Sequence, residues 1–327
     1  MRVRKLNVLS CELEESLDEA GFRHASTSIG QRIGADRIGA SLYEADADHP
    51  IWPYHYHYST EEWMYVISGA PVLRDAGGRR ALSSGDVLCF PSSHLGAHTT
   101  YGPGRFIIFA TNESPGPWVS VYPDSDKIGI SPGTHEGSAL NGLRLPRAGA
   151  VDYWYGEGGN DALDPVHVER EPPSAPSRPV LNALTVPLSD PGDDVPAGFR
   201  CRAARLGPAL GGAGLGATVL ELDPGEGSAP YHYEHGRQEW ALVLAGAPTL
   251  RHPDGEDVLQ TGDVACFPEG PTGAHQLINC DDQVVRAVLF STQGLPANVC
   301  YPDTGTWLIR NGPDGQSITL HETEQTD

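Results

Sequence analysis

The chain repeats itself, because short segments of its first half recur in its second half at a nearly fixed distance. GFR at 21–23 returns at 198–200, which is 177 residues later. A separation that holds across several such matches indicates an internal duplication. The fold must therefore be one that a unit of about 150 residues can adopt twice. The other matches at the same separation are IGAS (38) with LGAT (215), PYHYH (53) with PYHYE (230), GDVLCFP (85) with GDVACFP (262), and GAH (96) with GAH (273).

The length supports the same division, since 327 residues exceed what one hydrophobic core usually organises. The segment 158–178 overlaps GEGGND (156–161) and EREPPSAPSRP (169–179), and this Gly- and Pro-rich composition is typical of a linker. We therefore expect a first domain over 1–157 and a second over 179–327.

Within each copy the local pattern predicts β-strands. Short runs of β-branched and aromatic residues end at Gly or Pro, and DAGG at 75–78 and PDGE at 253–256 are hairpin-turn sequences. Such a pattern favours an all-β fold, a closed barrel or a sandwich. ELEESLDEAG at 12–21 is the best candidate for a helix. The runs that carry the strand prediction are WMYVISG (63–69), DVLCF (86–90) and RFIIFAT (105–111).

Charge and cysteine usage narrow the function. The net charge is −21 and no cluster of Lys or Arg exists, so we expect no nucleic-acid binding and no attraction to anionic membranes. We expect no signal peptide, and because no stretch of 18 apolar residues occurs, we expect no transmembrane helix. The six cysteines form no CxxC pair, and Cys89 and Cys266 lie in apolar runs as small core residues. A reducing, cytoplasmic location is the expectation.

A cluster of metal-ligand residues stands at the centre of the first copy. His55 and His57 are two apart, so in a strand their side chains share one face. Glu62 follows after a turn and can rejoin that face, and His98 follows a strand that a proline stops. Four such groups in one cavity are typical of a metal site. The alternative is a polar cluster that satisfies itself by hydrogen bonds inside the fold.

These residues resemble the two motifs of the cupins. The first is His-x-His, four residues, Glu, six residues, Gly; the second is Gly, five residues, Pro, then Gly-x-His. Because both motifs recur, the chain resembles a bicupin. The resemblance implies two tandem small antiparallel β-barrels of the double-stranded β-helix, or jelly-roll, type. It also implies one divalent transition metal, for which Fe²⁺ is favoured and Mn²⁺, Ni²⁺, Zn²⁺ or Cu²⁺ are alternatives. The implied ligands are His55, His57, Glu62 and His98.

The second copy departs from this pattern at one position. Glu234 stands where the first copy has His57, and His235 follows it. Strand parity puts Glu234 on the ligand face, although a bulge could bring His235 in instead. An added carboxylate would favour manganese, iron or zinc. The alternative is a degenerate copy whose polar groups only hydrogen-bond. The expected ligands of this less certain site are His232, Glu234, Glu239 and His275.

Other residues have weaker interpretations. Arg74 and Arg251 match between the copies; either could bind a substrate carboxylate, but a surface charge at a hairpin is the preferred reading. Trp63 and Trp240 should face away from the metal, as outer packing or a domain interface. His94 could lie behind the metal ligands or face a substrate, but an exposed loop residue is the preferred interpretation. The repeated Tyr-Pro-Asp segments at 122–124 and 301–303 are 179 residues apart; they suggest a strand crossing or an interdomain contact, and no chemistry.

The function expected from these features is a metal-dependent oxidoreductase of the dioxygenase type. Its substrate would be a small organic acid or a phenolic or heterocyclic metabolite, and Glu62 would be a ligand or a base. A redox-neutral isomerase, decarboxylase or lyase is the first alternative, and a non-catalytic binding protein the second. The first copy should be the active one because its ligand set is more complete. A homodimer is compatible with the sequence.

Overall fold

A computed structural model describes residues 5–46, 48–112, 117–131, 142–150, 176–310 and 317–321. The expected boundary at 157 and residues 158–175 of the expected linker lie outside these ranges. We call residues 5–150 the first half and 176–321 the second half. Both are built almost entirely from antiparallel strands, as the short Gly- and Pro-bounded runs predict. None of the described helices has the length and apolar character needed to cross a membrane.

The first half contributes to three sheets. The largest has seven strands in the order β15-β9-β6-β11-β4-β3-β2, a second has the order β10-β7-β8, and a third has the order β14-β13-β12-β5. The strands of this half are β2 (Glu15–Glu19), β3 (Phe22–Ser28), β4 (Ile38–Ala45), β5 (Tyr56–His57), β6 (Glu62–Gly69), β7 (Val72–Asp75), β8 (Gly78–Ala81), β9 (Asp86–Phe90), β10 (His98–Tyr101), β11 (Gly104–Thr111), β12 (Trp118–Tyr122), β13 (Lys127–Ser131) and β14 (Leu143–Pro146).

The second half repeats this layout in the orders β1-β22-β19-β24-β17-β16, β21-β20-β23 and β18-β25-β26-β27. Its strands are β15 (Leu181–Asn182), β16 (Cys201–Arg205), β17 (Leu215–Leu222), β18 (Tyr233–His235), β19 (Glu239–Ala245), β20 (Thr249–His252), β21 (Gly255–Val258), β22 (Asp263–Phe267), β23 (Gln276–Ile278), β24 (Val285–Thr292), β25 (Ala297–Tyr301), β26 (Thr306–Arg310) and β27 (Ser317–His321), while β1 (Lys5–Asn7) comes from the start of the chain.

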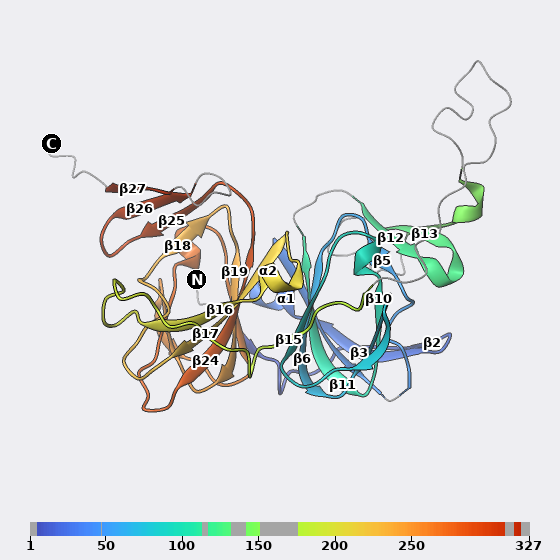
Figure 1. The fold of residues 1–327 in the computed structure, drawn as a ribbon, viewed down its shortest axis with the longest axis horizontal. Coiled ribbons are helices and arrows are strands. Elements are labelled where there is room, and N and C mark those ends of the chain that lie inside the picture. The colour runs from blue at the N-terminus through green and yellow to red at the C-terminus, as the bar shows by residue number, and fades with distance from the viewer. Residues whose placement is uncertain are drawn as a thin grey trace, which may run out of the picture.

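Helices are few and short, and the two α-helices lie between the halves (Figure 1). Each ends at a glycine in the left-handed region, Gly34 with φ 80° and Gly211 with φ 79°, where a side chain would be strained. The helices are α1 (Ile29–Ile33) and α2 (Gly207–Leu210), with the 3-10 turns η1 (His94–Gly96), η2 (Pro123–Ser125), η3 (Arg147–Gly149) and η4 (Pro271–Gly273).

The helix expected over residues 12–21 is wrong. Residues 15–19 form β2, which pairs with β3 from Glu15 opposite Ser26 to Glu19 opposite Phe22. Ala20 and Gly21 join the two strands with φ values of 53° and 86°, the positive angles of a two-residue hairpin turn. Pairing in the sheet therefore outweighs the helix propensity of the acidic segment.

The two halves exchange their first strands. β1 pairs with β22 of the second half, and β15, which opens the second half, pairs with β9 of the first half. In each pair an asparagine amide donates to an aspartate carboxylate at 2.9 Å, from Asn7 to Asp263 and from Asn182 to Asp86. Figure 1 accordingly shows the N-terminus among the yellow-to-red strands of the second half. The halves are thus joined by main-chain hydrogen bonds as well as by side chains.

A shared apolar core fills the space between the halves. Trp63 and Trp240 are 0% and 1% exposed, and both belong to a buried cluster drawn from the two halves. The ring of Trp63 meets Phe290 edge-on at 6.3 Å, and Trp240 meets Phe109 in the same way at 5.6 Å. This confirms the expectation that the two tryptophans pack away from the ligand face, at an interface.

Glu61 and Gln238 form matching polar contacts across the same interface. The carboxylate of Glu61 accepts from the backbone N–H groups of residues 213, 214 and 215 at 2.8, 3.1 and 2.9 Å, and from the Trp63 indole at 2.8 Å. Gln238 Oε1 accepts from the N–H groups of residues 37 and 38 at 3.1 and 2.9 Å, and its amide donates to Asp36 at 2.5 Å. Each half therefore caps the turn that precedes a central strand of the other.

Candidate metal centre

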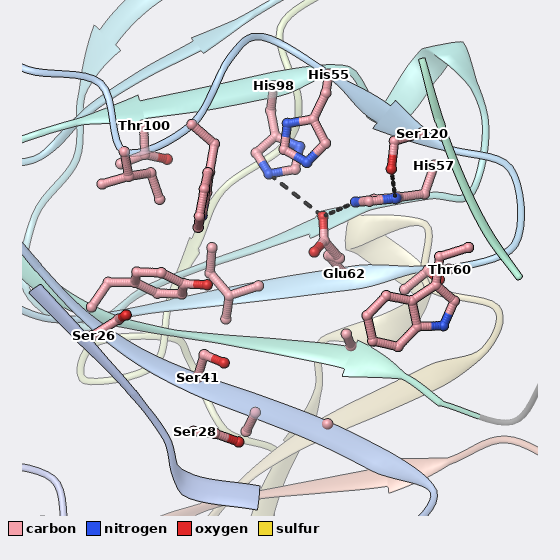
Figure 2. Close-up of a pocket in the computed structure, with 18 of the residues that line it drawn as sticks. Ser26, Ser28, Ser41, His55, His57, Thr60, Glu62, His98, Thr100 and Ser120 are labelled. Atoms are coloured by element: carbon pink, nitrogen blue, oxygen red, sulfur yellow. Dashed lines mark hydrogen bonds and ion pairs between the residues drawn. The ribbon is translucent and has the colours of Figure 1, made fainter. Parts of the chain in front are cut away.

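Three strands, β5, β6 and β10, bring the predicted ligands of the first half together. His55 lies just before β5 and forms an isolated antiparallel bridge with His98, the first residue of β10. The two backbones exchange hydrogen bonds of 3.1 and 2.9 Å. His57 ends β5 and Glu62 begins β6. Figure 2 shows the four side chains pointing toward one another, as the spacing of the motifs predicts.

Backbone carbonyl groups fix the orientation of two of the imidazoles. His55 Nδ1 donates to the carbonyl of Pro53 at 2.8 Å, and His98 Nδ1 donates to the carbonyl of Gly96 at 2.9 Å. A neutral ring that donates through Nδ1 keeps its lone pair on Nε2. Both rings therefore present Nε2 as an acceptor, and such outer hydrogen bonds are typical of metal-binding histidines.

Glu62 lies at the focus of the imidazoles. Its Oε2 atom is 3.4 Å from His57 Nε2 and 3.7 Å from His98 Nε2. The ligand atoms of His55, Glu62 and His98 all lie within 4.8 Å of one another. Oε2 is buried and makes no hydrogen bond to the described residues. A buried anionic oxygen among nitrogen acceptors is costly unless a cation joins them, so this donor set fits a divalent metal.

Burial sets the protonation of the cluster. It lowers the pKa of His55 to about 3, with help from His57 and His98, and it also lowers the pKa of His98. Burial acts to raise the pKa of Glu62, but the neighbouring imidazoles, His57 first, lower it by more. At neutral pH, His55 and His98 are therefore uncharged and Glu62 is ionised, which is the state that a metal requires.

The cluster opens into a cavity of about 450 Å³ within the first half (Figure 2). Its wall carries the four ligands, several hydroxyl side chains and the aromatic rings of Tyr43, Trp52, Trp118 and Tyr122. Met64 and Val66, which strand parity would also place in the wall, belong instead to a buried apolar cluster. Met64 packs behind the wall, with its sulfur 3.8 Å from the hydroxyl of Thr100. The volume suits a small or medium-sized molecule.

The second half builds a similar but incomplete group. The ligand atoms of His232, Glu239 and His275 lie within 4.8 Å of one another. His232 Nδ1 bonds the carbonyl of Pro230 at 2.8 Å and His275 Nδ1 that of Gly273 at 2.9 Å, as in the first half. Burial lowers the pKa of His275 well below its ordinary value.

Glu234, the predicted fourth residue of the second group, is buried, whereas His235 is exposed. The ring of His235 lies parallel to that of Trp307 at 5.9 Å, on the outer side of the strand. This is the arrangement that strand parity predicts, without a bulge. Arg237, however, reaches to 3.9 Å from the Glu234 carboxylate. A guanidinium therefore lies close to the carboxylate that replaces His57.

Three positions that line the cavity in the first half carry aliphatic residues in the second half. Leu220 stands in place of Tyr43 and Leu277 in place of Thr100, and both belong to a packed apolar cluster. Val299 replaces Ser120; the two lie 179 residues apart, as the two Tyr-Pro-Asp segments do. At these three positions the second half thus has an aliphatic side chain where the first half has a hydroxyl-bearing one.

The two repeated arginines bind partners within the protein. Arg74 forms a bidentate pair with Asp124 at 2.5 and 2.7 Å, and its guanidinium lies 4.2 Å above the ring of Tyr54. Arg251 makes the same pair with Asp303 at 2.6 and 2.8 Å. In each half, the aspartate of the repeated Tyr-Pro-Asp segment therefore binds an arginine of the same half. His94 is exposed, as expected.

Sequence reasoning missed Ser120 and the hydroxyl-bearing wall. Ser120 Oγ lies 3.1 Å from Nδ1 of His57 and is placed there by the pairing of β12 with β5. No motif marks this serine, and the second copy lacks it. The wall residues come from several distant strands, so their meeting depends on the register of whole sheets.

Comparison with known proteins gives one family match and several similar solved structures. The family described as a cupin domain matches residues 218–291. A solved sugar phosphate isomerase of the cupin superfamily from Silicibacter pomeroyi is 26% identical and covers 40% of this chain and 85% of its own, with a TM-score of 0.37. An oxalate decarboxylase of Bacillus subtilis is 13% identical and covers 89% of this chain and 77% of its own, with a TM-score of 0.48. No curated protein matches the chain.

Proposed function

Since this chain belongs to the cupin superfamily, we propose that it is a metal-dependent enzyme whose reaction takes place in the cavity of the first half. One observation carries the proposal. The ligand group of the first half opens onto a cavity of about 450 Å³, whereas leucines occupy two of the corresponding positions in the second half. Ligands that face a cavity can present a metal to a substrate, and the second group then has a supporting role.

Each ligand residue has a defined part. His55 and His98 present Nε2 because their Nδ1 atoms are engaged by carbonyl groups. Glu62 supplies the negative charge, and its low pKa favours the role of ligand over that of general base, since a weak base takes up protons poorly at neutral pH. A bound divalent cation would supply Lewis-acid polarisation of a substrate oxygen.

We favour a redox-neutral reaction of the isomerase, lyase or decarboxylase class. The hydroxyl groups of the wall suit a substrate that is rich in oxygen functions, and such a substrate can place a carbonyl or hydroxyl oxygen against a Lewis acid. A dioxygenase that uses Fe²⁺ is the second candidate. The four aromatic rings of the wall favour it, because they suit a flat phenolic or heterocyclic substrate.

Oxygen dependence separates the two reactions. Protein loaded with Mn²⁺ or Fe²⁺ would be screened against hydroxylated sugars and phenols, with and without dioxygen. Turnover that persists under anaerobic conditions supports the redox-neutral proposal, while oxygen uptake in step with substrate loss overturns it in favour of the dioxygenase. Protein purified without chelator that holds no stoichiometric metal contradicts both, and leaves a non-catalytic binding protein.

The finer architecture is also a proposal. We propose that the three sheets of each half close into a small antiparallel barrel and that 1–157 and 179–327 are the two units. The repeated sheet orders support this. The six free cysteines support a reducing compartment such as the cytoplasm. Cleavage by a protease that is confined to residues 158–178 would test the boundary.

A further inference from the structure

The wall of the cavity is unusual in its polar groups, which are mostly hydroxyls. They come from five separate strands and from the loop between β5 and β6, so they surround the space from several sides (Figure 2). Thr100 is 1% and Thr60 is 7% exposed, so both are inside the protein. The Ser and Thr side chains in the wall are Ser26, Thr27, Ser28, Ser41, Thr60, Thr99, Thr100, Ser120 and Ser131.

The described residues of this wall include no lysine or arginine. Among the described residues that line it, the only charged groups besides the histidines are Glu15, on the exposed strand β2, and Glu62. Arg74 was one candidate for binding a substrate carboxylate, but its guanidinium is paired with Asp124 and stacks on the ring of Tyr54. The charge of a divalent metal ion bound by the ligands would be balanced by the carboxylates of Glu15 and Glu62. Besides that metal ion, a phosphate or dicarboxylate would therefore find no cationic Lys or Arg side chain in the described wall, and its entry would carry a high desolvation cost.

We propose that the first-half cavity selects an uncharged, hydroxyl-bearing small molecule and discriminates against phosphorylated and carboxylated analogues. Serine and threonine hydroxyls both donate and accept, so they can match the hydroxyls of a neutral ligand in either direction. Tyr43 and Trp52 supply apolar faces for its carbon skeleton. The inference rests on the proposed function, because it names the substrate class of the same site.

The second half shows that this backbone accommodates basic residues at two of the same positions. Arg205 corresponds to Ser28 and Arg237 to Thr60, each 177 residues later. Ser28 and Arg205 end matching strands, β3 and β16, and both are exposed. The neutrality of the first-half cavity is therefore a matter of its side chains and not of the fold.

Titration calorimetry on the full-length protein loaded with Mn²⁺ tests the inference. The probes are two matched pairs, D-ribose with D-ribose 5-phosphate and catechol with 3,4-dihydroxybenzoate, at pH 7 and fixed ionic strength. For at least one pair we expect the neutral member to bind about 10-fold or more tighter than its anionic partner. Anionic members that bind as tightly or more tightly overturn the inference, as does a screen in which no probe binds.

A single variant reverses the preference. Ser28→Arg places a guanidinium at the cavity rim without touching the metal ligands, so we expect the anionic member of the pair to gain about 10-fold relative to the neutral one. Ser28→Thr is the matched control and should keep the original preference. No change in Ser28→Arg contradicts the charge argument. Metal content is measured in the same samples. If the unchanged protein holds no metal, the proposed function fails. If it holds metal but prefers the anionic probes, only this inference fails.

Discussion

Ser120 Oγ lies 3.1 Å from Nδ1 of His57, while Nε2 of the same ring faces Glu62 at 3.4 Å. The hydroxyl orients the one ligand imidazole of the first half that no backbone carbonyl holds. We therefore expect Ser120→Ala to weaken metal binding about 10-fold, as the loss of an outer hydrogen bond does at other sites. Competition titration with a chelating dye measures this. Ser120→Thr keeps the hydroxyl and should bind metal almost as the unchanged protein does; equal affinity in Ser120→Ala would contradict the role.

The two metal groups should respond differently to the loss of a ligand. His98→Ala removes a buried ligand of the first half, and we expect turnover to fall at least about 100-fold. The matched variant His275→Ala removes the equivalent ligand of the second half and should keep turnover within about 3-fold. Metal analysis of both variants shows whether each has lost its own ion. Turnover that depends on His275 and not on His98 would move the reaction to the second half.

Two substitutions should convert the interface contacts of Glu61 into those that Gln238 of the second half makes. In Glu61→Gln the new amide group would face backbone N–H donors, which should lower the free energy of unfolding by about 1–3 kcal/mol. Ala213 is the counterpart of Asp36, the residue that accepts from the Gln238 amide. Adding Ala213→Asp should therefore recover part of the loss. Urea unfolding of the two variants measures this, and a double variant no more stable than the single one would count against the assigned contacts.

The metal-free protein should lose stability in acid. An unfolded histidine takes up a proton near pH 6.5, but folded His55 does so only near about 3. Between these two pH values the unfolded chain binds more protons than the folded protein. The free energy of unfolding therefore decreases as the pH is lowered, by at most about 1.4 kcal/mol per pH unit for each such group. The lowered pKa of Glu62 has the same sign below pH 4.5. Unfolding of chelator-treated protein at pH 7, 5 and 4 tests this, and His55→Gln should show a shallower slope.

Arg74 should matter for stability and not for substrate binding. Its bidentate pair with Asp124 is largely exposed, so we expect Arg74→Ala to cost about 1 kcal/mol or less. KM should stay within about 2-fold, because the guanidinium is already bound within the protein. Arg251→Ala, which breaks the same pair in the second half, is the control. A large rise in KM that only Arg74→Ala shows would restore this residue as a substrate ligand.

The sequence predicts those features that depend on short spacing. Strand parity alone places His55 and His57 together and separates Glu234 from His235, because side chains alternate along any strand. The β2 hairpin was missed because an acidic segment has no strand pattern of its own and pairs only through β3. Ser120 was missed for a related reason: its contact with His57 depends on the register of β12 against β5, which no local signal specifies.

The exchanged strands impose an order on folding during synthesis. β1 is made before the rest of the first half, but its partner β22 emerges about 256 residues later, so β1 has no sheet partner while the whole first half is synthesised. In the same interval the edge of β9 stays open until residues 181–182 leave the ribosome. A nascent first half therefore displays an unpaired strand edge, which makes it the species most exposed to mispairing with another chain.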